Sequence, residues 1–114
     1  MLNNLFGSSQ IIISGLNKSW NRNQVISDNI ANSETDGYKA KDVFVNELNS
    51  FINNDTVSFS VQERTDGIVK PNGNNVDMEK EMTSLVENSI EYNALIQALT
   101  RELRKIEYVI NEGR

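Results

Sequence analysis

The chain has 114 residues, enough for one domain, with a formal net charge of −5 and a hydrophobic content of 38%. It contains neither cysteine nor histidine, which excludes disulfides, thiolate chemistry, ordinary zinc sites and the usual general base at neutral pH. The acidic balance argues against a nucleic-acid partner, because binding to a phosphate backbone needs a basic stripe.

The N-terminal part predicts one amphipathic helix over residues 9–31, after a flexible start over residues 1–7. The start lacks the basic and apolar regions of a cleavable signal peptide. Within the helix, apolar residues recur at helical steps: Ile12 or Ile13, Leu16, Trp20, Ile26 and Ile30. Gly15 and Asn23 weaken this stripe, so we expect the helix to need a partner.

Residues 33–76 contain turn signals and short apolar patterns. Asp36-Gly37 is a strong turn pair, because Gly accepts a positive φ and Asp hydrogen-bonds its own backbone. Apolar residues then predict a short helix beginning after Asp42: Val43, Phe44, Leu48, Phe51 and Ile52. A half-buried strand through Val57, Phe59 and Val61 is expected to turn at Asp66-Gly67 and return as a hairpin through Ile68 and Val69. Alternatively, this segment orders only against a neighbour.

The strongest pattern predicts a long helix over residues 77–111. Alternating steps of four and three define a seam that is apolar except at Ser89: Met78, Met82, Leu85, Ser89, Tyr92, Ile96, Leu99, Leu103, Ile106 and Ile110. Such spacing keeps one apolar stripe facing a partner helix in a coiled coil. Asp77 is the expected N-cap, since its carboxylate can accept hydrogen bonds from the first free N–H groups.

Together the two helices predict a mainly α fold in which they pair as an antiparallel coiled coil. We expect the seam from Met82 to Ile110 to pair with Leu16, Trp20, Ile26 and Ile30. Leu95, Val109, Ile90 and Tyr108 add apolar surface beyond this seam, so several neighbours are expected. The isolated chain should then be loosely ordered at its ends and in its middle. The alternative is an ordinary core helix of a small bundle.

No motif for catalysis or for a bound cofactor emerges. The loop over residues 66–77 lacks EF-hand spacing, and the sequence has no P-loop, nucleophile elbow or Gly-rich dinucleotide turn. We therefore predict a protein that is not an enzyme, with no catalytic residue, cofactor, metal or small-molecule substrate. No run approaches the roughly 18 apolar residues of a transmembrane helix.

Two stretches resemble the axial proteins of the bacterial flagellar rod and hook. The first covers the end of the N-terminal helix and its turn, where the family pattern runs roughly N-I-A-N-x-x-T-P-G-Y. The matching residues are Asn29, Ile30, Ala31, Asn32, Thr35, Gly37 and Tyr38. Asp36 replaces the usual proline, which forgoes a pre-set φ but keeps a good turn residue.

The second stretch, residues 73–82 with residues 87–88 and 92–95, resembles the start of the terminal helix in the short proximal-rod members of the family. The short middle segment fits those members, because distal rod and hook proteins carry larger inserted domains. Of the two proximal types, the match favours the B-type, with the C-type as the alternative. Outside the proximal rod, the alternatives are another axial protein or a small helical adaptor such as a secretion chaperone.

The resemblance implies a structural subunit of a hollow helical rod that links the membrane ring to the hook and transmits torque. Its partners would be other rod proteins, the ring–rod adaptor, the membrane-ring protein and further copies of itself. The flagellar type III apparatus would export it, without a cleavable signal peptide, to act outside the inner membrane. One structural domain is expected, in three parts: residues 1–38, 39–76 and 77–114. Asn29 and Asn32 are expected to cap backbone groups where the first helix ends, and Tyr38 to pack on a neighbour or on the helix pair.

Overall fold

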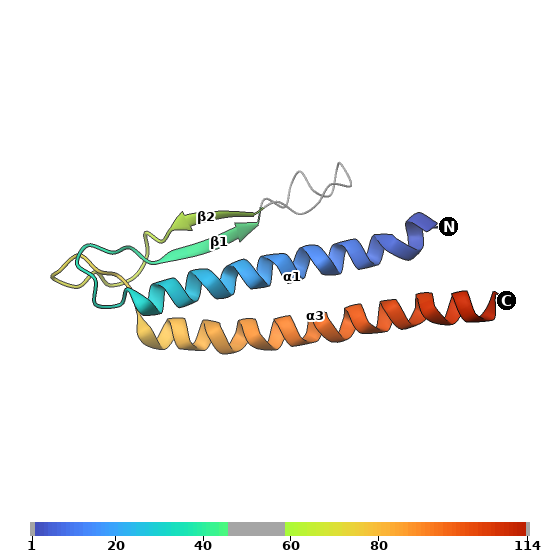
Figure 1. Cartoon of the computed structure of the whole chain (residues 1–114). Helices are drawn as coiled ribbons and strands as arrows, with labels where there is room; N and C mark the ends of the chain where they lie inside the picture. The colour runs from blue at the N-terminus through green and yellow to red at the C-terminus, as the bar shows by residue number, and fades with distance from the viewer. Residues whose placement is uncertain (1, 46–58, 114) are drawn as a thin grey trace.

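The computed structural model describes residues 2–45 and 59–113 as two long helices and a two-stranded hairpin (Figure 1). Helix α1 spans Leu2–Ala31, strand β1 Lys41–Val45, strand β2 Phe59–Glu63 and helix α3 Met78–Glu112. This arrangement confirms the predicted mainly α fold with two long terminal helices and a small antiparallel hairpin between them.

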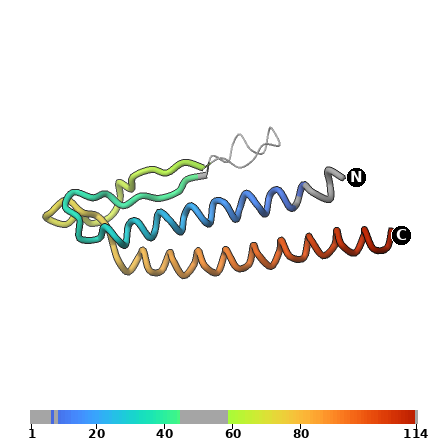
Figure 2. The backbone as a smooth tube through the Cα atoms, viewed as in Figure 1, coloured from blue at the N-terminus to red at the C-terminus, as the bar shows by residue number. Residues whose placement is uncertain are grey.

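The two long helices lie side by side and antiparallel, so that α1 begins and α3 ends at the same end of the molecule (Figures 1 and 2). The molecule measures 68 × 28 × 15 Å along its principal axes, and its radius of gyration is 18.4 Å. A compact chain of this length would have a radius of gyration of roughly 13 Å. The chain is therefore a thin rod with a large surface for its size.

Helix α3 begins where predicted because Asp77 is its N-cap. The Asp77 carboxylate accepts hydrogen bonds from the backbone N–H groups of Glu79 (3.1 Å) and Lys80 (3.3 Å). These bonds satisfy free donors of the first turn, where Glu79 and Glu81 also complement the helix dipole. Neither Gly nor Pro interrupts the helix before Gly113, so it runs for 35 residues, which is roughly 50 Å.

Helix α1 begins at Leu2 rather than near Ser9, so the prediction of a flexible start is wrong for residues 2–7. This stretch contains no proline, and a helix that has already nucleated extends at little cost per residue. The end of α1 at Ala31 is as predicted. Gly37 then takes the positive φ, 72°, that the predicted turn requires.

The hairpin pairs different segments from those predicted. Strand β1 runs antiparallel to β2, with Lys41 opposite Glu63 and Val43 opposite Val61. The prediction of a helix after Asp42 is therefore wrong for residues 43–45, where adjacent β-branched and aromatic residues favour a strand. Ile68 and Val69 are not its return strand either, and both are exposed. Leu48, Phe51, Ile52 and Val57 lie outside the described residues.

The apolar core is small and lies at one end of the rod, where α1, the hairpin and the start of α3 meet. Among the described residues, the buried hydrophobic side chains are Val25, Ile26, Ala40 and Val76. Seven polar or charged residues are buried as well: Ser9, Ser19, Asn29, Asn74, Asn75, Glu81 and Asn88. Hydrogen bonds therefore carry much of the tertiary organisation. Neither α1 nor α3 is apolar enough over a sufficient length to cross a membrane.

Candidate functional site

The seam between the two helices differs from the predicted one at every second position. The α3 residues that face α1 are buried or half-buried and follow steps of four and three: Glu81, Leu85, Asn88, Tyr92, Leu95, Leu99, Glu102 and Ile106. Leu85, Tyr92, Leu99 and Ile106 belong to both seams. The other observed column lies one residue before the predicted one. Three of its members are polar, so a search for apolar spacing does not identify them.

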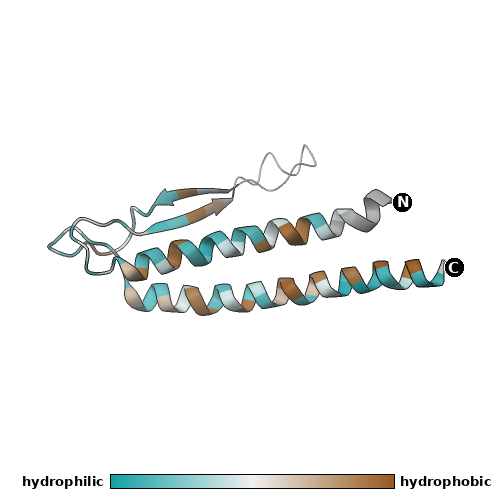
Figure 3. Ribbon diagram, viewed as in Figure 1, coloured by the Kyte–Doolittle hydropathy of each residue, from teal (hydrophilic) through white to brown (hydrophobic). Residues whose placement is uncertain are grey.

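The displaced column leaves an apolar stripe on the outside of α3. Met82, Ile96, Leu103 and Ile110 are between 39% and 60% exposed, and we call them the outer stripe. On α1, Ile26 is buried and Leu16 and Ile30 are half-buried, whereas Trp20 is 54% exposed. Figure 3 shows apolar residues distributed along the length of both helices. The single chain therefore leaves much of its predicted interaction surface uncovered.

Small residues on α1 determine how closely the helices approach. A Cβ atom added to Gly15 would lie 3.3 Å from Cδ1 of Leu95, so the glycine leaves room for that side chain. One turn further along α1, Ser19 meets Asn88 of α3. Asn88 donates through Nδ2 to the backbone oxygen of Ser19 at 2.8 Å, and the Ser19 hydroxyl donates to Asn88 Oδ1 at 3.1 Å. This buried polar layer holds the two helices in one register, because a slip would leave its groups unpaired.

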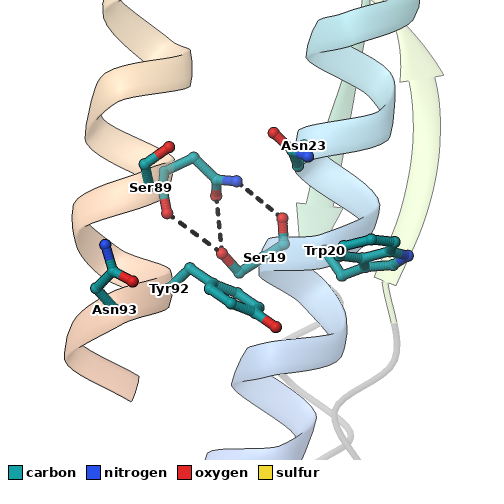
Figure 4. A pocket seen from close by; sticks show the side chains of 7 residues that line it. Ser19, Trp20, Asn23, Ser89, Tyr92 and Asn93 are labelled. Atoms are coloured by element: carbon teal, nitrogen blue, oxygen red, sulfur yellow. Dashed lines mark hydrogen bonds between the residues drawn. The ribbon is translucent and has the colours of Figure 1, made fainter. Parts of the chain in front are cut away.

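A shallow groove lies beside that polar layer (Figure 4). It has a volume of about 220 Å³ and is lined by Ser19, Trp20, Asn23, Asn88, Ser89, Tyr92 and Asn93. In Figure 4, Tyr92 extends from α3 across to α1, while Trp20 points away from α3. The lining carries amide, hydroxyl and indole groups, and none of its side chains is Asp, Glu, Lys or Arg.

The first motif is organised around Asn29, whose side-chain amide makes four hydrogen bonds. Its Nδ2 donates to the backbone oxygen of Lys41 (2.9 Å) and to Glu81 Oε2 (3.2 Å). Its Oδ1 accepts from the Tyr38 hydroxyl and from the Lys41 backbone N–H, both at 3.0 Å. Asn29 therefore joins α1, β1 and α3 and uses the full hydrogen-bonding capacity of its amide.

Glu81, on α3, is the acidic partner of this network and is fully buried. Arg64, just after β2, places Nη2 3.0 Å from Glu81 Oε1 and 3.9 Å from Asp42 Oδ2. The contact with Glu81 is a close ion pair without ideal hydrogen-bond alignment, and Arg64 Nε has no partner in the described part of the chain. Sequence analysis missed Glu81 because it reads as a helix-surface charge. Its place four residues before Leu85, in register with the seam, was the available signal.

The second motif closes over the first through asparagine side chains. Asn74 Nδ2 donates to the backbone oxygens of Asn32 and Thr35, both at 2.8 Å, and so satisfies carbonyls at the end of α1. Asn75 Oδ1 accepts from the Ala40 N–H at 2.6 Å. Gly73 passes so close that a Cβ there would lie 3.3 Å from the Cα of Gly37. The two motifs, far apart in sequence, form a single polar junction.

The structure also places the remaining motif residues. Asn32 donates through Nδ2 to the backbone oxygen of Asp28 at 2.8 Å, which caps the end of α1. Tyr38 is half-buried and packs within its own chain against Asn29. Burial, followed by the negative charges of Asp28, Glu81 and Glu63, raises the pKa of the Tyr38 phenol above its usual value of 10.0. Among residues 2–45 and 59–113, no cluster of acidic side chains is suited to hold a metal ion.

Comparisons with known proteins agree with the motif resemblance. A family model described as "Flagella basal body rod protein" matches residues 10–39, which cover most of α1 and the turn after it. The flagellar basal body rod protein FlgB of Bacillus subtilis is 32% identical over 95% of this chain and 96% of its own length. FlgB of Escherichia coli is 27% identical over 99% of both chains. FlgB of Borreliella burgdorferi is 30% identical over 78% of this chain and 84% of its own.

Proposed function

This chain belongs to the FlgB family of flagellar basal body rod proteins, and on that premise we propose that it is built into the proximal rod as a structural subunit that transmits torque. In this role both long helices run within the rod wall, packed against neighbouring subunits. The rod would connect the membrane ring to the hook. The chain's contribution is mechanical, and we expect it to have no enzymatic activity.

The uncovered apolar surface carries this proposal. Among the described residues, four hydrophobic side chains are buried, while the outer stripe and Trp20 remain exposed. Apolar side chains that recur exposed along one side of a helix mark a contact with another protein. Contacts that join different surfaces of successive copies give open helical assemblies, which is the form a rod requires.

The partners we propose are other rod proteins, the ring–rod adaptor, the membrane-ring protein and further copies of this chain. Export would proceed through the flagellar type III apparatus, and the assembled subunit would lie in the basal body outside the inner membrane.

Aspartate substitutions in the outer stripe and in the seam between α1 and α3 test the proposal. Leu103→Asp charges the outer stripe without entering the space between α1 and α3, so we expect a folded chain that is not incorporated into basal bodies and cells that do not swim. Leu99→Asp charges the intramolecular seam, and we expect it to lower the free energy of unfolding by about 2–4 kcal/mol as well as to prevent assembly.

The matched control is Gln97→Asp, which changes an exposed residue outside the outer stripe and outside the seam between the helices. Circular dichroism of the purified variants and immunodetection in isolated basal bodies provide the two readouts. Normal swimming and normal incorporation of the Leu103→Asp variant would remove the outer stripe from the proposal. Failure of the Gln97→Asp control would show that any added charge is harmful.

A further inference from the structure

Another face of α3 carries a charge pattern that is complementary to itself when the helix is reversed. This face lies beside the seam on the side opposite the outer stripe, and we call it the lateral face. Its residues also follow steps of four and three: Lys80, Ser84, Glu87, Glu91, Ala94, Ala98, Arg101, Lys105, Tyr108 and Glu112. Ser84 and Ala98 are half-buried and the others are exposed.

Two copies placed antiparallel, with the midpoint of the pair level with Ile96, match at every position of the lateral face. Opposite charges meet towards the ends, small residues meet at the centre, and each tyrosine lies over a serine. The resulting pairs are Lys80–Glu112, Glu87–Lys105, Glu91–Arg101, Ser84–Tyr108 and Ala94–Ala98. Each pair joins the two different heptad columns of the face, as knobs-into-holes packing of antiparallel helices requires.

Other ways of pairing this face are less favourable. A parallel pair in register would place Glu87 against Glu87 and Arg101 against Arg101, and like charges at an interface repel. The antiparallel pair instead covers Tyr108, which is 66% exposed in the single chain. Lys80 and Lys105 already contact Asp66 (3.5 Å) and Glu102 (3.3 Å), but both lysines are exposed, and ion pairs of exposed lysines exchange partners at little cost.

We propose that free copies of this chain associate through the lateral face as an antiparallel, two-fold symmetric dimer. Such an interface is closed, because each copy uses the same patch and none remains for a third. Copies in a helical rod all point the same way, so this dimer is not a fragment of the rod and must separate before its subunits are incorporated. The inference concerns the free chain and goes beyond the rod role. With small central residues and mostly charged flanks, the association is weak and decreases with added salt.

Charge reversal provides the first test, by sedimentation equilibrium of the full chain at low and high salt. The double variant Glu87→Lys with Glu91→Lys should weaken dimerisation at least tenfold, since it faces Arg101 and Lys105 of the second copy. Adding Arg101→Glu and Lys105→Glu restores opposite charges at the same positions and should restore the dimer. The control, Glu79→Lys with Glu107→Lys, makes the same change in net charge outside the lateral face and should leave dimerisation unchanged.

Disulfide cross-linking tests the direction, because the natural chain has no cysteine. Ser84→Cys and Tyr108→Cys variants, mixed and oxidised, should form a cross-linked pair containing one copy of each, while neither variant cross-links alone. Cross-linking of Ser84→Cys with itself would indicate a parallel pair and overturn the proposal, as would a monomer at all concentrations or a dimer indifferent to charge reversal. None of these results bears on incorporation into basal bodies, so the rod proposal stands or falls separately.

Discussion

At the scale of single residues, Asn29 shows why this family motif requires an amide at the end of the first helix. The side chain must donate to Glu81 and to a backbone oxygen while it accepts from Tyr38 and from a backbone N–H. A hydroxyl has too few donors, and a carboxylate has none. Ser, Thr and Asp are common near helix ends, but none of them can join the same three elements.

Replacing Asn29 by Asp tests this requirement. The variant loses both N–H donors and places a carboxylate beside that of the buried Glu81, so we expect the free energy of unfolding to fall by about 3 kcal/mol. Urea denaturation followed by circular dichroism measures the loss. Asn111→Asp, at an exposed position on α3, serves as the control and should change stability little. Equal stability of the two variants would contradict the central role given to Asn29.

Tyr38 makes the free energy of unfolding depend on pH in the alkaline range. Its pKa is raised in the folded chain, so the folded state keeps the phenol proton at pH values where the unfolded state has lost it. This contribution to stability is complete below the unfolded pKa of about 10 and is lost as pH rises through the folded pKa. The free energy of unfolding should therefore decline above that pH.

Tyr38→Phe should remove part of this decline. At neutral pH the variant should be less stable by about 1 kcal/mol, because the hydrogen bond to Asn29 is lost. In more alkaline solution its stability should approach that of the natural chain. Urea midpoints measured across the alkaline range provide the comparison, with Tyr108→Phe at an exposed position as the control. Parallel curves for Tyr38→Phe and the natural chain would show that the phenol does not titrate as inferred.

At the scale of the elements, the sequence predicts the presence, capping and period of the helices better than which face of each helix is buried. Asp77 and the uninterrupted heptads predict α3 correctly, because these signals are local. The phase of the seam depends on Glu81 and Asn88, which are buried because α1 supplies Asn29 and Ser19 opposite them. Polar groups are buried when partners from distant segments satisfy them, and no spacing within α3 reveals those partners.

The same limit explains the hairpin and the junction. A run such as Val43 and Phe44 is too short to separate strand from helix by its period, and pairing with β2 across an intervening segment decides the outcome. The two family motifs were recognisable separately. The hydrogen bonds from Asn74 to the backbone oxygens of Asn32 and Thr35 could be found only from the three-dimensional structure.

Gly15 permits a test of the close approach between α1 and α3. Gly15→Leu should lower the free energy of unfolding by about 2 kcal/mol, because the added side chain displaces Leu95. The control is Gly7→Leu, on the same helix, where a Cβ has no neighbour within 4 Å and the change should be neutral or stabilising. Combining Gly15→Leu with Leu95→Ala should recover part of the loss. Thermal melts of the natural chain, the two leucine variants and the double variant provide the comparison. Equal melting temperatures for Gly15→Leu and Gly7→Leu would contradict the close packing of Gly15 against Leu95.

At the scale of the whole molecule, order is unevenly distributed along the rod. The buried hydrophobic residues Val25, Ile26, Ala40 and Val76 all lie near the polar junction, as do Asn29, Asn74 and Glu81. Towards the other end, the later seam residues are half-buried at most and the outer stripe is exposed. A rod anchored at one end is suited to a subunit whose remaining surface is completed by neighbours.

Hydrogen exchange of the isolated chain should reveal this gradient. Amides of residues 25–31 and 78–92 should be the most protected, and protection should fall towards the first turns of α1 and the last turns of α3, because local opening there exposes little apolar surface. The proposed rod contacts cover the outer stripe, so protection near Leu103 and Ile110 should rise by at least tenfold in assembled rods. Mass spectrometry of exchanged peptides from both states measures the difference. Uniform protection along both helices of the dilute chain would mean that a single copy already stabilises its full length, and the exposed stripe would then need another explanation.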